Sequence, residues 1–424
     1  MTSSRRLALI AFFVLSLPSQ AHATLGLFEH GNGIKSMGMG GVGYSFAEET
    51  TVLGANPAHA LALGNRYDIG VDIFGAEAEA IYENNNLNPE QFDPNETLLS
   101  DGKRYYYIPQ GGFSMALSER WALGVAVLSA GLGADYDGSP YERFGGAART
   151  TLQLASSSVV TALAYQLDEN HALGFSLNTG YQVLSVKGLE FLDNVALSES
   201  PGKVTNQGKD GALTLGFSLG WHGKLTPWLS AGLAYRSKNW TQKHEDYAGL
   251  VAEGGKLELP SIYGGGIAIT PAPNWTLVLE AQRYTYRKQT AFRNGIAGLE
   301  QGALLGSADG PGFGFNDQNA YKLGIGWQAT PKLMLRGGYI YATRIVQPSE
   351  TLFGFLACLT TGMQYALGAT YQLEKWEVSA LLHHTPKETV YGRDSIPAAF
   401  GGGEANVSDM VLGAGISFGR RFGR

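Results

Sequence analysis

The 424-residue sequence predicts an all-β fold, a 14-stranded antiparallel transmembrane β-barrel with an N-terminal plug in its lumen. From about residue 66, apolar and polar residues alternate repeatedly, which is typical of strands with one apolar and one polar face. Short polar turns alternate with long variable segments, the arrangement of outer-membrane barrels. The chain has 58 glycines and 11% aromatic residues, yet no apolar run of about 18 residues follows residue 23. The sequence therefore predicts no membrane-spanning helix after that point.

Residues 1–23 have the pattern of a removable signal peptide. Two arginines precede an apolar segment at 7–17, and Ala21-His22-Ala23 provides an A-x-A cleavage site. Loss of the two arginines changes the formal net charge from −6 to −8, and this acidic balance predicts no nucleic-acid partner. The single cysteine, Cys358, excludes an internal disulfide scaffold.

Residues 24–64 break the alternation and are predicted to form the plug. This segment is too irregular for strands and too rich in glycine for one long helix. A barrel of fourteen strands would leave an aqueous hole without such a segment in its lumen.

Residues 65–424 are predicted to form the barrel itself. In 171–186, for example, Leu173, Phe175 and Leu177 share one face while Ser176 and Asn178 share the other. The predicted strands span 66–81, 104–118, 120–135, 150–168, 170–188, 209–224, 227–243, 256–270, 274–290, 318–329, 332–346, 361–373, 375–389 and 407–418.

A second rhythm places a bulky residue directly after each short polar turn. Trp121, Trp228, Trp275 and Trp376 follow this rule, and we expect them in an aromatic girdle at one membrane interface. Secreted β-solenoids and propellers are the alternatives, and kelch propellers also repeat near 50 residues. A propeller blade, however, needs four strands per repeat, and the pattern here provides two long ones.

The chain resembles the FadL family of outer-membrane transporters for long-chain fatty acids, which includes relatives for aromatic hydrocarbons. The resemblance is carried by 33–43 (GIKSMGMGGVG), 46–49 (FAEE), 56–58 (NPA), 234–237 (AYRS), 257–260 (LELP) and 315–324. It implies that 24–64 is the family's hatch, a plug that includes Gly38, Gly40, Gly41, Asn56, Pro57 and Ala58. The Asn-Pro-Ala triplet is expected to act as a hinge or to contact the barrel wall, with an ordinary Asn-Pro turn as the alternative.

The resemblance further implies a passive route with lateral exit into the bilayer. A hydrophobic molecule would be captured between extracellular loops and would leave through a gap at a kink in the third strand. That kink is expected at Ser129, Ala130, Gly131 and Gly133, and strand glycines do favour a bulge or bend. The alternative is that these glycines only relieve crowding near the loop.

The candidate ligand contacts are Phe28, Lys187, Arg236, Lys238 and Lys322. Family members hold the fatty acid carboxylate with basic residues, but Glu190 stands near one expected position and 306–314 contains no Lys or Arg. A less acidic or hydroxylated ligand is therefore plausible. The apolar stretch 352–356 predicts either capture of hydrophobic ligands or packing between loops.

No enzymatic activity, cofactor or metal is expected. The spacing Gly38-x-Gly40-x-x-Gly43 matches a dinucleotide-binding fingerprint but lacks the surrounding βαβ unit. His383 and His384 are adjacent in a predicted strand and would point to opposite faces, so they cannot readily share one metal ion.

The predicted function is a passive channel in the bacterial outer membrane for long-chain fatty acids or similar hydrophobic molecules. Its expected partners are these ligands and outer-membrane lipid, and the barrel is expected to be monomeric. Export of oxidised or hydroxylated fatty acids and uptake of aromatic hydrocarbons remain alternatives. A structural or adhesive barrel is the alternative of a different class.

Overall fold

A computed structural model describes residues 26–100, 105–360 and 362–423. The predicted signal peptide, residues 1–23, lies outside the described residues. None of the helices in these ranges is long and apolar enough to cross a membrane.

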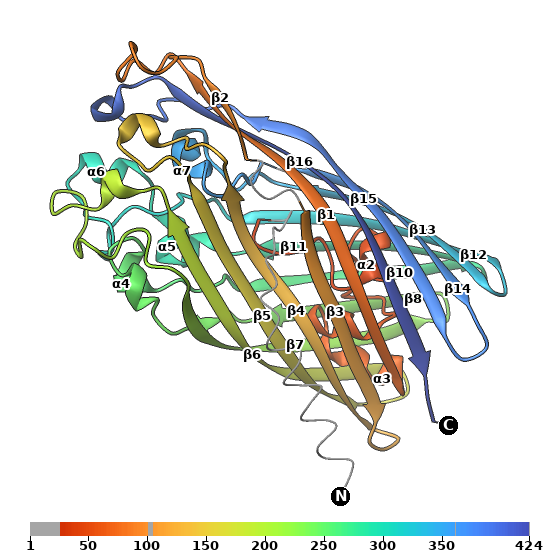
Figure 1. Ribbon diagram of the computed structural model, residues 1–424. Coiled ribbons are helices and arrows are strands. Elements are labelled where there is room, and N and C mark those ends of the chain that lie inside the picture. Colours follow the sequence, from red (N-terminus) through yellow and green to blue (C-terminus); the bar gives the residue numbers. More distant parts are fainter. Residues whose placement is uncertain (1–25, 101–104, 361, 424) are drawn as a thin grey trace, which may run out of the picture.

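A closed antiparallel β-barrel forms the body of the molecule (Figure 1). Its last strand pairs with its first over their full lengths, from Arg66 opposite Arg421 to Glu83 opposite Glu404. Two short strands, β2 (Thr97–Ser100) and β9 (Trp240–Thr241), extend the ladders of β1 and β7. Within the described ranges the barrel strands number fourteen, as predicted: β1 (Arg66–Glu83), β3 (Tyr105–Ala116), β4 (Trp121–Asp135), β5 (Thr151–Gln166), β6 (His171–Lys187), β7 (Asp210–Thr226), β8 (Leu229–Arg236), β10 (Ile262–Ala272), β11 (Trp275–Tyr284), β12 (Gln318–Thr330), β13 (Leu333–Ala342), β14 (Met363–Gln372), β15 (Glu377–Val390) and β16 (Glu404–Arg421).

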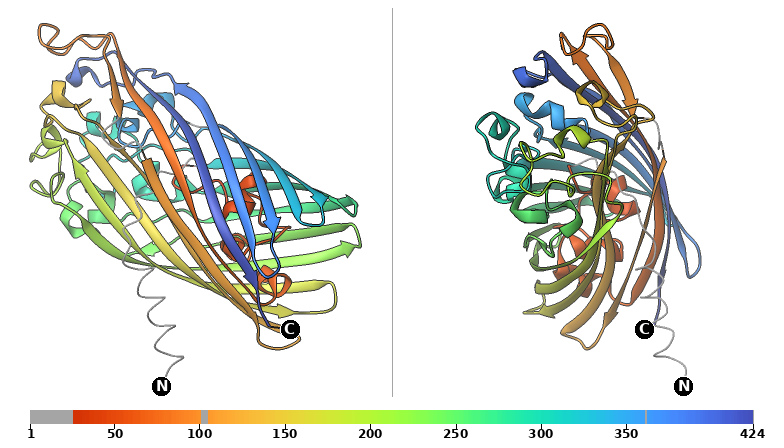
Figure 2. Two further views of the ribbon diagram at one scale, coloured as in Figure 1. Left: turned by 45° about the vertical axis from the view of Figure 1, so that its right-hand side comes forward. Right: turned by 60° about the vertical axis from the view of Figure 1, so that its left-hand side comes forward.

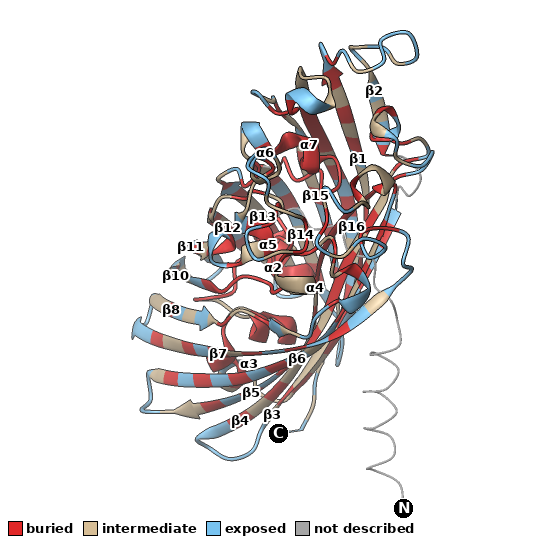
Figure 3. Cartoon of the chain, turned by 90° about the vertical axis from the view of Figure 1, so that its left-hand side faces the viewer, coloured by how far each residue is buried: buried red, intermediate tan, exposed pale blue. Residues whose placement is uncertain are grey.

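The two faces of the strands differ as the alternation predicts. In β6, Leu173, Phe175 and Leu177 are exposed on the outside, whereas Ser176 and Asn178 are buried on the inside. Figure 3 shows this alternation as bands of buried and exposed residues along β5, β6 and β7. An apolar outer surface with polar residues inside is the reverse of a water-soluble protein and suits a barrel in lipid.

All the short turns lie at one end of the barrel and the long loops at the other (Figure 1). The tryptophans that follow the short turns are exposed on the outside, and Trp275 stacks on Trp327 with ring centroids 5.6 Å apart. The predicted aromatic girdle is therefore present at the short-turn end.

The predicted boundaries fail where strands enter the long loops. The predicted strand at 227–243 leaves the ladder after Arg236, and the one at 256–270 begins only at Ile262. Alternation continues across these segments, but the regular ladder between β8 and β10 ends, and Trp240 and Thr241 pair with β7 only as the short strand β9.

The long loops contain short helices packed over the barrel mouth. Leu352 and Phe355 are buried in the largest apolar cluster, which joins these loops to the upper ends of the strands. The helices are η3 (Glu142–Phe144), η4 (Glu190–Leu192), η5 (Glu245–Tyr247), α4 (Ala252–Gly255), η6 (Tyr286–Lys288), α5 (Thr290–Arg293), α6 (Ala297–Glu300), η7 (Pro348–Glu350), α7 (Thr351–Gly354) and η8 (Ala398–Phe400).

The N-terminal segment lies inside the ring of strands as a plug, which we call the hatch (residues 26–64; Figure 2). Its helices α2 (Ile34–Gly38), η1 (Thr50–Gly54), η2 (Pro57–His59) and α3 (Ala60–Leu63) are short, as the glycine content predicts. Helix α2 contacts β13, β14 and β15, while η2 contacts β5, β6 and β7 on the other side. The hatch therefore bridges opposite walls of the barrel.

Glycines of the barrel wall allow this close packing. A Cβ atom at Gly220 would lie 2.0 Å from Asn56 Oδ1, and one at Gly174 would lie 2.2 Å from the Ala58 nitrogen. At Gly338, a Cβ atom would lie 1.9 Å from the Gly40 nitrogen. At these positions the wall has no room for a side chain.

Gly338 and its neighbour Gly337 provide a test of this packing. Gly338→Ala should lower the free energy of unfolding by about 1–3 kcal/mol, because the added methyl group overpacks the contact with Gly40. Gly337→Ala should change it by less than about 0.5 kcal/mol, since a Cβ atom there would meet no atom within 4 Å. Denaturant titration in detergent micelles, followed by tryptophan fluorescence, measures both values. Equal effects of the two substitutions would contradict the proposed contact.

Candidate functional site

An apolar cavity lies beneath the long loops, where strands β4, β5 and β6 meet the loop helices. It contains about 610 Å³ of space unfilled by atoms. Its lining consists of Leu, Val, Ala, Phe, Pro and Gly residues alone. Phe353 and Leu356 belong to this lining, so the apolar stretch 352–356 contributes both to loop packing and to a cavity. We call this space the upper cavity.

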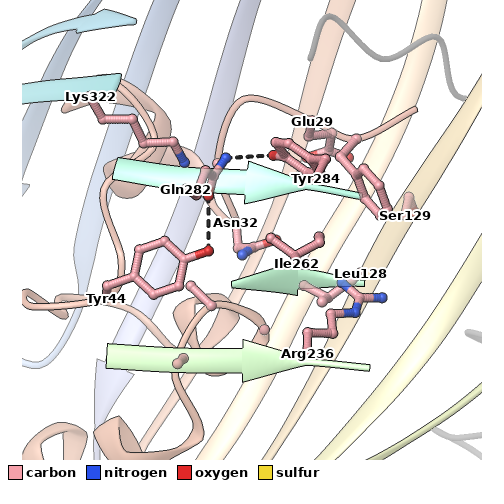
Figure 4. Close-up of a pocket in the computed structure, with 15 residues that line it drawn as sticks. Glu29, Asn32, Tyr44, Leu128, Ser129, Arg236, Ile262, Gln282, Tyr284 and Lys322 are labelled. Carbon is pink, nitrogen blue, oxygen red and sulfur yellow. Dashed lines mark hydrogen bonds between the residues drawn. The ribbon is translucent and has the colours of Figure 1, made fainter. Parts of the chain in front are cut away.

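A second, more polar cavity lies directly above the hatch (Figure 4). The hatch contributes Tyr44, Gly54 and Ala55, and β4 contributes Leu128 and Ser129. Its remaining lining includes Phe28, Glu29, Asn32, Arg236, Ile262, Gln282, Tyr284 and Lys322. We call this space the lower cavity.

Strand β4 runs along both cavities. Leu128 and Ser129 line the lower cavity, and Leu132 lines the upper one. Between them lie Ala130 and Gly131, two of the residues predicted for the lateral gate. The structure therefore places the predicted gate segment between the two cavities.

The barrel ladder is incomplete at this segment. β3 and β4 pair from Ala116 opposite Ala122 to Gly111 opposite Val127, and their ladder ends there. Above that point β3 stays paired with β1, and β4 stays paired with β5 up to Asp135. Among the described residues, the facing edges of 105–110 and 128–135 thus share no ladder. We call this interruption the seam.

Pro109 gives a physical reason for the seam. The Leu117 N–H donates to the Trp121 carbonyl at 2.8 Å, so hydrogen-bonded pairs of this ladder recur at every second residue from there. Two residues beyond Gly111 and Val127, the next such pair would be Pro109 and Ser129. Proline has no N–H to donate, so the ladder loses a bond where it stops.

Residues 27–28 take the place of β3 beside the upper part of β4. Phe28 forms an antiparallel bridge with Ala130, and the Gly131 N–H donates to the Leu27 carbonyl at 2.7 Å. The Leu27 N–H in turn donates to the Tyr286 hydroxyl at 3.1 Å. We call residues 27–28 the bridging segment.

The residues predicted for the lateral gate show no bulge toward β5. The β4–β5 ladder runs without a register shift through Ser129, Ala130, Gly131 and Gly133. A Cβ atom at Gly133 would lie 2.2 Å from the Leu152 carbonyl oxygen, so the close approach of the two strands requires glycine there. The interruption lies on the other edge of β4.

The hatch is fixed to the wall by carboxylates. Glu280 of β11 accepts hydrogen bonds from the backbone N–H groups of Gly43, Tyr44 and Ser45, each at 2.8 Å. Lys35 of the hatch pairs with Glu377 of β15, four strands away from β11. Such buried, charge-assisted contacts hold the hatch in a single position.

Glu48 and Arg336 form a further bidentate pair between hatch and wall, with N–O distances of 2.8 and 3.0 Å. Burial acts to raise the pKa of Glu48, but the adjacent Arg336 guanidinium outweighs it and holds that pKa below its ordinary value. Glu49 instead accepts hydrogen bonds from the backbone N–H groups of Lys35 and Ser36, and burial, with the charge of Asp68, raises its pKa to about 7.

The predicted hatch residues contact the wall. The Asn56 side chain donates to the Tyr44 and Trp221 carbonyls at 2.8 and 2.9 Å and accepts from the Ala58 N–H, with Pro57 opening η2. The triplet thus forms an Asn-Pro turn that also touches the barrel. Gly38, Gly40 and Gly41 pass close to backbone atoms, of Gly368, Leu323 and His30 respectively.

The five predicted ligand contacts fall in different places. Lys187 is exposed, and Lys238 pairs with Glu258 at 2.6 Å. Lys322 lines the lower cavity but donates to the Gly41 carbonyl at 2.6 Å. The structure brings Arg236 and Phe28 together in the lower cavity.

Sequence reasoning did not identify Pro109, Leu27 or Glu280. A proline within an alternating strand was a visible signal for an interrupted edge. Glu280 had no such signal, because it occupies an inward-facing position like any other polar residue of an alternating strand.

Comparison with known proteins gives one family and several related structures. A family model described as outer membrane protein transport protein (OMPP1/FadL/TodX) matches residues 23–380. A Pseudomonas aeruginosa FadL homologue is 14% identical with a TM-score of 0.71, covering 94% of this chain and 100% of that one. The toluene transporter TodX of P. putida is 15% identical with a TM-score of 0.67, covering 93% and 99% of the two chains. The toluene transporter TbuX of Ralstonia pickettii is 16% identical with a TM-score of 0.63, again covering 93% and 99%. No curated protein matches the chain.

Arg336→Gln should loosen the hatch and let ions leak at neutral pH. Removing one partner of a buried pair leaves an uncompensated charge, at a cost of about 3–5 kcal/mol.

In the wild type, the ion pair between Glu48 and Arg336 should be lost at acidic pH. Because the folded pKa of Glu48 lies below its ordinary 4.5, its stabilisation is complete above that pH and is lost as the pH falls through the folded pKa. Single-channel conductance in planar bilayers measures both effects. The control is Arg283→Gln, which breaks a half-exposed ion pair with Asp317 and should leave the conductance unchanged.

Pro109→Val should extend the β3–β4 ladder, because it restores the missing N–H donor. We expect slower amide hydrogen exchange around Ser129, measured by mass spectrometry in nanodiscs. Pro271→Val, at an exposed position near the end of β10, is the matched control and should leave that exchange unchanged. Unchanged exchange in Pro109→Val would show that the proline does not set the seam.

Proposed function

This chain belongs to the family of outer membrane transport proteins that includes FadL and TodX, and on this premise we propose a passive lateral route for its ligands. A long-chain fatty acid or similar hydrophobic molecule enters the upper cavity from the loops, passes along β4, and leaves sideways through the seam. Family members are transport channels of the outer membrane, not enzymes.

The observation that carries the proposal is the position of the seam above a fixed hatch. Glu280, Lys35 and Arg336 hold the hatch to strands β11, β15 and β13, and Asn56 holds it to β7, which opposes passage straight through the bore. The seam lies beside both cavities, on the same strand that lines them. A ligand in either cavity is therefore adjacent to the seam.

The upper cavity supports a hydrophobic ligand. Burying apolar surface contributes about 25 cal/mol per Å², and the lining offers only apolar residues. Its lining carries no charged side chain within the described residues, in line with the absence of Lys and Arg from 306–314. Selection in the upper cavity thus acts on hydrocarbon surface, whether an acyl chain or an aromatic ring.

Energetically the route is downhill. The polar outer leaflet slows hydrophobic solutes, and a path lined by apolar groups lowers that barrier. Lateral exit delivers the ligand into the hydrocarbon of the membrane without exposing it to water, which would cost the burial energy again.

Blocking the seam reversibly tests the proposal. In a Cys358→Ser background, Ser129→Cys places a single thiol in the seam, and a bulky methanethiosulfonate reagent then fills it. We expect the flux of labelled oleate and of toluene into proteoliposomes to fall at least tenfold, and to recover when dithiothreitol removes the label. Ile325→Cys, on the lipid face of β12, carries the same label away from the seam and should leave flux unchanged. Complete labelling at Ser129→Cys with normal flux would rule out lateral exit there.

A further inference from the structure

Two histidines meet where the hatch touches β7, near the short-turn end of that strand. His59 is the last residue of η2, and His222 lies four residues before the end of β7 at Thr226. Their ring centroids are 4.9 Å apart, and the ring planes are inclined at 57°. The pair therefore joins the hatch directly to the barrel wall.

The Asn-Pro-Ala triplet holds His59 in this place. Asn56 donates to the carbonyls of Tyr44 and Trp221, so that η2 is fixed beside β7 one residue before His222. His59 Nε2 lies 3.0 Å from the same Tyr44 carbonyl oxygen. A carbonyl oxygen can only accept a hydrogen bond, so Nε2 of the neutral ring carries the proton and Nδ1 keeps a lone pair.

This lone pair of His59 is buried. Its Nδ1 atom has no hydrogen-bond partner among the described residues, and the residue is only 1% exposed. Burial, with the neighbouring His222 ring, lowers the pKa of His59 to about 3, so the ring is neutral at physiological pH. A buried polar atom without a partner costs about 1–3 kcal/mol. A partner from outside the chain would therefore stabilise the hatch at this point.

The spacing of the two rings suits a shared metal ion. Two imidazoles bound to one tetrahedral zinc ion, each at about 2.0–2.1 Å, have their centroids about 5 Å apart. The observed centroid distance is 4.9 Å. Histidines that bind metals also commonly donate their other ring N–H to a backbone carbonyl, as His59 does to Tyr44. The His222 ring makes a polar contact with the backbone of the next hatch residue, Ser45.

We propose that His59 and His222 form a binding site for a divalent transition-metal ion such as Zn²⁺, with water completing the coordination. Imidazole nitrogen suits this class of ion, whereas Mg²⁺ and Ca²⁺ prefer oxygen ligands. The bound ion ties η2 to β7 and fixes the hatch more firmly in the bore. This inference is independent of the lateral route, because it concerns only the attachment of the hatch.

An ion reaches the pair from the short-turn end of the barrel. His222 is partly exposed, and Lys224, two residues closer to the turn, is exposed. Lys224 and His171 are the other basic groups close to His222. The charge of Lys224 opposes a cation, but solvent screens it at this exposed position.

Titration with Zn²⁺ tests the site. The untagged chain without its signal peptide, in detergent micelles, should take up one ion in competition with a fluorescent zinc indicator. His59→Gln and His222→Gln should each weaken binding at least tenfold, since losing only the hydrogen-bond partner of a ligand already costs about 10–100-fold. His384→Gln removes an imidazole that contacts the Val411 carbonyl instead, and should leave the affinity unchanged. Equal affinity in the wild type and in both site variants would overturn the proposal.

Cu²⁺ identifies the ligands directly. Its electron paramagnetic resonance spectrum should show coupling to two imidazole nitrogens in the wild type and to one nitrogen in either site variant. A wild-type spectrum with a single coupled nitrogen would contradict the shared site.

Hydrogen exchange measures the effect on the hatch. The Ala58 N–H donates to the Asn56 side chain and reports the opening of η2. At ten times its dissociation constant, Zn²⁺ should slow exchange of this amide about tenfold, because the opened segment must release the ion. Mg²⁺ should have no effect, and Zn²⁺ should have none in His222→Gln. Zn²⁺ that binds to both rings and leaves this exchange unchanged would overturn the proposed tie between hatch and wall.

Discussion

Every backbone amide in contact with lipid hydrocarbon must find a hydrogen-bond partner within the protein, and this constraint governs the structure. The pairing of β16 with β1 removes the two edges that an open sheet would leave in lipid. An opening in the wall therefore has to leave amides of two strands without their partners. At the seam the cost is reduced from both sides: Pro109 has no N–H to lose, and the Leu27 carbonyl accepts the Gly131 N–H. The hatch and the seam are consequently linked, because the same N-terminal chain plugs the bore and covers the edge of β4.

This constraint also explains how much of the fold was predictable. A strand between lipid and a polar lumen must alternate with period two, so fourteen strands could be found from residues such as Leu173 and Ser176. The boundaries between strands and loops depend on where pairing with a neighbouring strand stops, and the sequence of one strand does not contain this information. For this reason the predicted strand end at 243 was wrong, and β8 ends at Arg236. The family resemblance predicted a gate on β4, and the structure has the seam along the same residues. Pro109 was not predicted, because its effect depends on its position opposite Ser129, which is fixed by the register across the β3–β4 turn. The ligand residues divide in the same way: charge and inward direction were readable for Lys322 and Arg236, but their partners come from the hatch.

The glycine content has a structural explanation in this packing. A lumen filled by a folded segment brings two backbones face to face, as at Gly220 with Asn56 and at Gly338 with Gly40. Side chains on the wall would hold the hatch away and leave gaps through which water and ions pass. Small wall residues instead let Asn56 donate directly to the Trp221 carbonyl of the barrel. A high glycine count in a barrel sequence with an irregular N-terminal segment is thus consistent with a tightly seated plug.

The charges within the bore serve two different purposes. Arg336 and Lys35 face carboxylates, and their pairing repays the cost of leaving water while fixing the hatch in register. Arg236 has no charged partner among the described residues, and its guanidinium carbon lies 5.7 Å from the centre of the Phe28 ring, a contact worth about 0.5–2 kcal/mol. It therefore contributes little to fixing the hatch. Its effect is to place a positive charge at the lower cavity, beside the bridging segment.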